Sequence, residues 1–425
     1  MNIFDQLLAD NQIPKFVRVR HEMDHSHIDD IEGAVAQAMR REGTLDRIKP
    51  GDSVCITAGS RDVANIARII RAICDQVKSV GAHPFIIPAM GSHAGAKAEG
   101  QRGIIEGYGV TEEAMGAPIR ASMDTEVIAH SKSGLEIHLD KFANAADFLI
   151  PVGRIKAHTD FRGEVESGIC KMLVIGMGKQ HGAYQCHKLG FKSMAANVKE
   201  FAGAIIEKKP NMFAIGLIEN AYHQTCRIEA IPAGRILEEE PPLLEYAKSR
   251  MAKVPFDQAD ILFVDETGKD ISGAGMDPNV TGRSPVLGIS RPFFQRIAVF
   301  DLTDKSHGNF GGLGSADVTT QRLYRKIDFE QTYPNGITAA EPLAVRLPAV
   351  MPSDRTAMQF ALRTATDCDW SKGPRIVWLK NTLSLSEFYI SEALIPDAEA
   401  LDNVTVVSEP MDVIFDEEGN VKELR

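Results

Sequence analysis

Strand-like and helix-like segments alternate along the first part of the chain, and this alternation constrains the fold more than any other feature. Residues 51–59 have the pattern of a strand and turn, residues 60–81 carry a helical periodicity, and residues 83–90 form the next apolar run. A strand, a helix and a second strand in this order form a βαβ unit, in which the two strands are parallel. We therefore predict an α/β fold with mostly parallel, doubly wound sheets.

The same alternation continues to about residue 220 and then starts again. Further strands are expected at 146–153, 171–178 and 212–220, with a helix at 191–208. After an acidic, proline-containing segment at 237–255, a second series of strand-like and helix-like segments follows. A change of this kind is typical of a domain boundary.

Two α/β domains with an active-site cleft between them are therefore expected. The N-terminal α/β domain, which should hold the catalytic and cofactor residues, spans 1–250, and a smaller C-terminal α/β domain spans 256–405. The last segment, 406–425, is expected to pack back on the N-terminal domain.

Charge and cysteine content exclude several classes of protein. The 425 residues carry a net charge of −11, which argues against a nucleic-acid-binding surface. The six cysteines are scattered without a CxxC pair, so a disulfide framework or a structural zinc site is not expected. Neither a signal peptide nor an apolar run of the ~18 residues that span a bilayer is recognisable, so we expect a cytoplasmic protein without a membrane partner.

Histidines and one lysine recur at strand ends between residues 93 and 187. His93 follows the apolar run FIIPAM, and His158 follows DFLIPVG. Lys171 lies thirteen residues after His158, and His187 lies sixteen residues further on. A lysine at the start of an apolar run is costly to bury as an ammonium ion, and such lysines often form covalent bonds. A Schiff-base lysine and a lysine that reaches out to solvent remain open alternatives.

A glycine-rich run, GMGKQHGA, follows the apolar segment after Lys171. Backbone N–H groups near Gly176 and Gly178 could bind a phosphate, and Lys179 would add a positive charge. The run matches neither the Walker A loop nor the GxGxxG pattern. It therefore predicts a phosphate site but no particular nucleotide, and an ordinary nicotinamide dehydrogenase is disfavoured.

The pattern of His93, His158, Lys171 and His187 resembles that of the nickel-dependent lactate racemase family. The resemblance implies that Lys171 carries a covalently attached nickel-pincer nucleotide and that His187 ligates its nickel ion. It also implies that His93 and His158 act as acid and base on opposite faces of the substrate. Gly176, Gly178 and Lys179 would then hold the phosphate of the cofactor.

The resemblance further implies a 2-hydroxy acid racemase or epimerase that removes and returns a hydride through this cofactor. Arg61 matches the substrate-carboxylate arginine of the family, and Lys269, in the polar loop 264–283, is the nearest candidate for a second substrate contact. The expected partners are a small hydroxy acid and, transiently, the proteins that make the cofactor.

Two other functions on the same fold remain open. The polar C-terminal loops favour a nickel-pincer epimerase or isomerase that acts on a larger sugar acid. A small-acid-binding protein that has lost the cofactor is the alternative from a different class.

Overall fold

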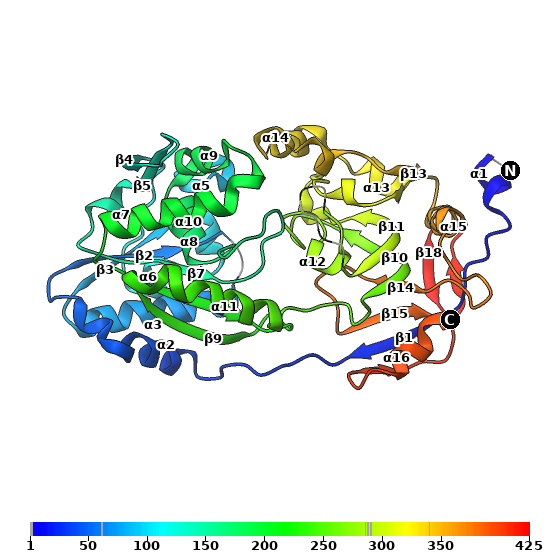
Figure 1. Ribbon diagram of the computed structural model, residues 1–425, viewed down its shortest axis with the longest axis horizontal. Coiled ribbons are helices and arrows are strands. Elements are labelled where there is room, and N and C mark those ends of the chain that lie inside the picture. Colours follow the sequence, from blue (N-terminus) through cyan, green and yellow to red (C-terminus); the bar gives the residue numbers. More distant parts are fainter. Residues whose placement is uncertain (1–2, 61–62, 285, 287–288, 290, 340) are drawn as a thin grey trace. The chain divides into compact units, whose positions relative to one another are not determined.

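The computed structural model describes residues 3–60, 63–284, 286, 289, 291–339 and 341–425. The chain forms two compact units (Figure 1). One unit is continuous and contains residues 24–251. The other contains residues 1–23 together with 252–425, and we call it the split unit.

A parallel sheet forms the centre of the 24–251 unit. The predicted βαβ unit is confirmed, because β2 and β3 pair in parallel along their whole length and α3 connects them. Pro151 interrupts the sheet between β6 and β7, and the chain then pairs with β8 in parallel. The strands, in spatial order, are β3 (His83–Pro88), β2 (Ser53–Ala58) and β6 (Phe148–Ile150), followed by β7 (Val152–Arg154), β8 (Phe213–Glu219) and the antiparallel β9 (Thr225–Pro232), with a separate hairpin of β4 (Thr125–His130) and β5 (Glu136–Asp140).

Both faces of this sheet are covered because successive strand residues point to opposite sides. On β2, Val54 and Ile56 join one apolar cluster, which also contains Ile69 of α3. Cys55, between them, joins another cluster, which contains Phe201 of α10. The helices of the unit are α2 (Ile31–Arg40), α3 (Ile66–Ser79), α4 (His93–Ala96), α5 (Ala98–Gly107), α6 (Glu112–Met115), α7 (Lys141–Ala145), α8 (Ile169–Lys171), α9 (Lys179–His187), α10 (Phe191–Lys208) and α11 (Ile236–Arg250).

The split unit contains a mixed sheet of eight strands. Its first five strands in spatial order are parallel, and the last three are antiparallel to their neighbours. The order is β13 (Ala349–Met351), β12 (Val318–Thr320), β11 (Phe293–Leu302), β10 (Gln258–Thr267), β14 (Ile376–Leu379), β15 (Glu387–Ser391), β1 (Phe16–His21) and β16 (Val404–Val406). The remaining elements are α1 (Ile3–Leu8), α12 (Pro278–Thr281), α13 (Gln321–Arg325), α14 (Phe329–Ala339), α15 (Asp354–Thr364), α16 (Ile395–Glu399) and the hairpin of β17 (Val413–Phe415) and β18 (Val421–Leu424).

Both ends of the chain belong to the split unit, which corrects the expected domain bounds. The N-terminal strand β1 lies between β15 and β16, so residues 1–23 are not part of the unit formed by 24–251 (Figure 1). The C-terminal segment 406–425 also packs here, because Met411 exchanges backbone hydrogen bonds with Phe16 and Val421 donates one to Asp354. Without β1, the edges of β15 and β16 would be unpaired. Strand β1 pairs with both, which joins residues 1–23 and the C-terminal strand to this unit.

Two segments differ in part from the sequence predictions. The predicted boundary at 237–255 contains the boundary between the two units, at residues 251 and 252, and most of this segment is helix α11, which runs through Pro241 and Pro242 and buries Leu243, Leu244 and Ala247. The expected strand at 171–178 is helical. A short apolar run fits a buried helix as well as a buried strand, so tertiary packing decides between them.

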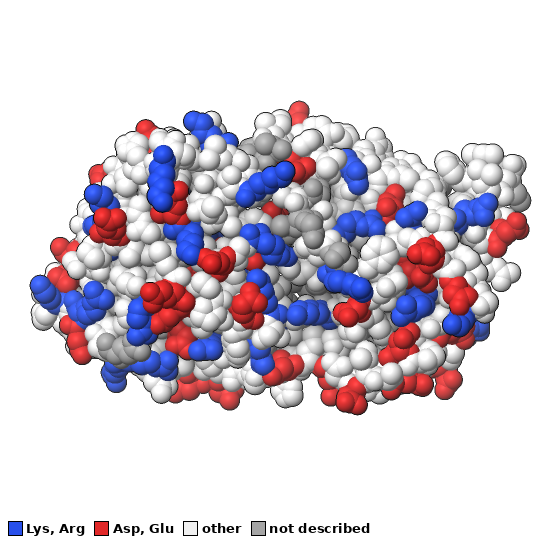
Figure 2. Space-filling view, viewed as in Figure 1, with Lys and Arg blue, Asp and Glu red and all other residues white. Residues whose placement is uncertain are grey.

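The surface is consistent with the mixed charge of the sequence. Figure 2 shows acidic and basic side chains intermingled over the visible face. Among the described residues, no helix combines the length and the apolar character that a membrane span requires.

Candidate active site

Three residues of the candidate site lie on consecutive elements after β7. His158 lies in the loop that leads to α8, Lys171 is the last residue of α8, and His187 is the last residue of α9. A single π-helical turn, η3 (Met172–Gly176), follows Lys171 directly. Such turns are rare and occur frequently at functional sites.

Loops from the carboxyl edge of the parallel sheet meet this π-helical turn. In the loop after β3, the Gly91 N–H donates to the Gly176 carbonyl over 3.4 Å. The loop after β2 passes so close that a Cβ atom on Gly59 would lie 3.3 Å from Met172 Cε. Because α/β proteins bind ligands at this edge of the sheet, η3 and the neighbouring Lys171 lie where the fold places a ligand.

Lys171 and His158 are in direct contact. The Lys171 Nζ atom lies 2.5 Å from His158 Nε2, and the Asp160 N–H donates to His158 Nδ1 over 2.9 Å. A neutral imidazole that accepts at Nδ1 carries its proton on Nε2. That proton can be shared with Lys171 only if the lysine is the neutral amine, so this arrangement favours the nucleophilic form of the side chain.

The surroundings of His158 disfavour its protonated form. Burial lowers the pKa of His158 well below its usual range, and the nearby positive charges of Lys156 and Arg162 lower it further. The imidazole packs against Phe161 in a tilted arrangement with a centroid distance of 4.2 Å. With only 12% of its side chain exposed, His158 is therefore a neutral imidazole.

His187 presents the chemistry of a metal ligand. Its Nδ1 atom lies 2.6 Å from the Ala183 carbonyl, which can only accept, so Nδ1 carries the proton and the Nε2 lone pair is available. Burial lowers the pKa of His187. The neighbouring Cys186 is fully buried, and burial raises its pKa to about 12, so this thiol does not ionise to a thiolate ligand at neutral pH.

His93 is exposed at the start of α4, in the loop after β3. Ala94 and Ala96 on either side of Gly95 have φ angles of 55° and 54°, a left-handed conformation that is strained for residues with a side chain. Gln101 stabilises the turn by donating to the carbonyls of Gly91 and His93. The fold therefore places His93 and His158 in loops at the same edge of the sheet.

The predicted phosphate site at residues 176–179 is not a ligand loop. A Cβ atom on Gly176 would lie 2.6 Å from Met172 Sδ, and one on Gly178 would lie 2.1 Å from the Val174 carbonyl oxygen. Lys179 is fully buried, 3.1 Å from Asp140 Oδ2. The glycines are needed for close helix packing and the lysine forms an interior ion pair, so we withdraw Gly176, Gly178 and Lys179 as cofactor contacts.

The two predicted substrate contacts remain predictions. Arg61 lies outside the described residues. Lys269 follows β10 in the split unit, where its Nζ atom donates to the Gly273 carbonyl over 2.6 Å and its backbone N–H donates to Ser306.

Three buried or nearly buried carboxylates support these loops. Glu219 pairs with Arg154 at 2.5 Å and accepts from the Ala64 N–H, which ties the end of β7 to the loop after β2. Glu166 accepts from the His158 N–H, and Glu240 accepts from the Cys170 N–H. Glu166 lies only eight residues from His158, whereas Glu219 and Glu240 come from distant segments, so local sequence gives no sign of the roles of those two.

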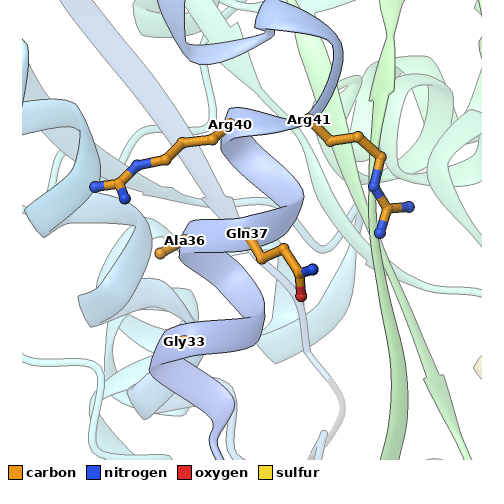
Figure 3. Close-up of a pocket in the computed structure, with 5 residues that line it drawn as sticks. All are labelled: Gly33, Ala36, Gln37, Arg40 and Arg41. Carbon is orange, nitrogen blue, oxygen red and sulfur yellow. The ribbon is translucent and has the colours of Figure 1, made fainter.

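A surface hollow of 610 Å³ lies on the outer side of α2, away from these residues in the sequence. It is lined by Gly33, Ala36, Gln37, Arg40 and Arg41, and Figure 3 shows the two arginines pointing in opposite directions from the helix. Arg41 is paired with Glu229 at 2.8 Å. Because a single helix lines this hollow, we assign no chemistry to it.

Comparisons with known proteins find a family model that matches part of the chain and a solved structure with a similar fold. Residues 4–198 match the family model described as the lactate racemase N-terminal domain. The solved lactate racemase apoprotein from Thermoanaerobacterium thermosaccharolyticum aligns with a TM-score of 0.53 and 16% identity, over 86% of this chain and 93% of that one. A protein from Thermotoga maritima aligns with a TM-score of 0.44 and 11% identity, over 83% and 87% of the two chains. The comparison with curated proteins finds no match.

Proposed function

We propose that this chain, whose residues 4–198 match the model of the lactate racemase N-terminal domain, is a racemase or epimerase of 2-hydroxy acids with a lysine-tethered nickel-pincer nucleotide. The contact between Lys171 and His158 supports this proposal most directly. A neutral amine next to a neutral imidazole suits covalent attachment at the lysine and proton transfer at the histidine.

The residues around this pair fit such a cofactor. Among the described residues, no group of three or more histidines, cysteines or carboxylates could hold a metal ion. The resemblance requires only one protein ligand, and the Nε2 lone pair of His187 supplies it. When bound, the cofactor would accept the α-hydride of the substrate and return it. Lys171 would hold the cofactor in place.

The two histidines would move the hydroxyl proton. His158, kept neutral by burial and by the nearby charges of Lys156 and Arg162, would exchange a proton with the substrate oxygen through Nε2 on one face. His93, from the loop after β3, would serve the opposite face. In this proposal, Arg61 and Lys269 bind the substrate carboxylate and a further polar group, respectively.

A Schiff-base enzyme is the second candidate, because the same neutral amine of Lys171 would attack a carbonyl substrate. Borohydride treatment in the presence of a keto acid distinguishes the two. A Schiff base would be reduced to a stable secondary amine on Lys171, whereas the proposed enzyme gives no such adduct.

The proposal is tested by co-expressing the chain with the enzymes that make the cofactor, then measuring its intact mass and nickel content. We expect a covalent mass increase that maps to Lys171 and about one nickel ion per chain. Lys171→Arg should lose both signals, whereas His187→Ala should keep the mass increase and lose the nickel. Unmodified wild-type protein under these conditions would contradict the proposal and favour a cofactor-free acid-binding protein.

A further inference from the structure

Glu240 of helix α11 contacts the helical turn that carries Lys171. Its side chain is fully buried, and Oε2 accepts from the Cys170 N–H over 2.8 Å. The Ile169 N–H also donates to this carboxylate. Both donors belong to the first turn of α8, whose N–H groups have no partner within the helix. The carboxylate therefore fixes the backbone immediately before Lys171.

The chain makes room for this carboxylate at a cost in stability. A Cβ atom on Gly168 would lie 2.1 Å from Glu240 Oε1, so any side chain at that position would displace the carboxylate. Among the described residues, Oε1 itself has no hydrogen-bond partner. Burial raises the pKa of Glu240, which reflects the unfavourable solvation of the charge. A buried acid with one unsatisfied oxygen is expensive unless the contact serves a purpose.

Helix α11 also supports the backbone of His158, the residue that contacts Lys171. Lys248 lies eight residues after Glu240, about 12 Å further along the helix, and its Nζ atom is 3.0 Å from Glu166 Oε1. The other oxygen of Glu166 accepts from the His158 N–H over 2.7 Å. One helix thus anchors the backbone of His158 at one end and the backbone before Lys171 at the other.

We propose that Glu240 is a positioning residue that holds the Lys171 amine against His158. It does so through the backbone of Ile169 and Cys170 and touches neither reacting group. The role rests on the proposed function, in which Lys171 is the reactive lysine. The neutral form of Lys171 depends on its contact with His158, so loss of the anchor should return the amine to solvent as an ordinary ammonium ion.

Trace acetylation with acetic anhydride between pH 6.5 and 8.5 tests this role on the full chain. The labelling rate of Lys171 is measured by peptide mass spectrometry against the exposed Lys192 as an internal reference. In the wild type, the rate at Lys171 should be nearly independent of pH. In Glu240→Ala it should rise about tenfold per pH unit, as for a solvated lysine. Glu240→Gln keeps an acceptor for the Cys170 N–H and should restore the flat profile.

Two further variants make the result decisive. Gly168→Ala displaces the carboxylate without removing it and should reproduce the steep profile, which covers the case in which Glu240→Ala fails to fold. Glu238→Gln, on the exposed side of α11, should behave as the wild type. A steep profile in the wild type would contradict the reactive lysine of the proposed function. A flat wild-type profile that stays flat in both Glu240→Ala and Gly168→Ala would contradict the positioning role alone.

Discussion

At the scale of single residues, hydrogen bonds set the protonation of each candidate group. The Asp160 N–H directs the proton of His158 to Nε2, and the Ala183 carbonyl directs the proton of His187 to Nδ1. The two histidines are therefore opposite tautomers. One faces Lys171 with a proton, and the other offers a lone pair to a metal ion.

Removal of either proposed acid–base histidine should abolish turnover. His158→Ala and His93→Ala should each lower kcat for racemisation by at least about 100-fold, because the hydroxyl proton then has no acceptor on one face. The racemisation rate is followed by chiral chromatography of the 2-hydroxy acid, and the nickel content of each variant serves as the loading control. Near-normal turnover in either loaded variant would rule out the two-base scheme.

Loss of Glu166 should destabilise the 24–251 unit. Its fully buried side chain pairs with Lys248, so Glu166→Ala removes the buried partner of that ammonium and leaves the His158 N–H without an acceptor. We expect a loss of about 2–4 kcal/mol in the free energy of unfolding, measured by urea denaturation. Glu245→Ala removes the exposed partner of the same lysine and should cost less than about 1 kcal/mol. Equal losses for the two variants would contradict the importance of the buried pair.

The sequence identified the groups that could react but not those that hold them. Strand-end position and the offsets to Lys171 and His187 are local features, so these residues could be found by inspection. Glu219 and Glu240 accept from backbone N–H groups of distant segments, and that information exists only in the folded chain. For the same reason, the interior role of Lys179 was mistaken for a phosphate contact.

At the scale of elements, the ion pair of Lys179 and Asp140 joins three parts of the 24–251 unit. Lys179 begins α9, and its Nζ atom also donates to the Pro88 carbonyl at the end of β3. Asp140 ends β5 and caps α7 by accepting from the Phe142 N–H. The pair thus fixes the start of the helix that carries His187 relative to the strand that leads to His93.

Breaking this pair should be costlier than removing both charges. Lys179→Met leaves the Asp140 carboxylate buried without its partner and should lower the free energy of unfolding by about 3–5 kcal/mol. Adding Asp140→Asn should recover part of this loss, because the amide oxygen still caps α7 and no charge remains. Urea denaturation of the two single variants and the double variant gives the coupling energy. If the losses in the free energy of unfolding of the two single variants simply add up in the double variant, the two charges do not interact directly.

Amphipathic helices could be predicted, whereas one apolar run and one proline-containing helix could not. Helix α3 and the helix at 191–208 are amphipathic, and β2 and β3 are short apolar runs on either side of α3. The run after Lys171 has no periodicity that separates strand from helix, and its π turn depends on packing against Gly59 and Gly91. The prolines of α11 indicated a domain boundary, which lies just after the helix, but burial of the apolar face of α11 outweighs their local preference.

At the scale of the whole molecule, the split unit carries its own dependence on pH. Burial raises the pKa of Asp265 to about 7, with Asp354 and Glu266 adding to the shift and Trp378 and Arg322 opposing it. Burial also raises the pKa of Asp354, to about 6.

Asp265→Asn should stabilise the split unit at alkaline pH. The unfolded carboxyl ionises near pH 3.9, so its stabilising contribution is full below that pH and is lost as the pH rises to about 7. At pH 8 the variant should gain about 2–4 kcal/mol, because the amide oxygen still accepts from Trp378 and no charge is buried. Thermal unfolding at pH 5 and pH 8 measures this, with the exposed Asp402→Asn as control. If the gain in stability of Asp265→Asn over the wild type is the same at pH 5 and pH 8, the prediction is wrong.

The position of β1 between β15 and β16 has a consequence for the order in which the protein is made. The ribosome synthesises the partner of β1 at Glu387 more than 360 residues after β1 itself. At bacterial and eukaryotic elongation rates this is a wait of roughly 20–70 s. The unit that carries Lys171 lies between the two, within residues 24–251, so all its residues emerge while β1 is still an unpaired strand. Strand β1 therefore pairs later than the strands of that unit, and nascent chains are most exposed to aggregation through β1 during this interval.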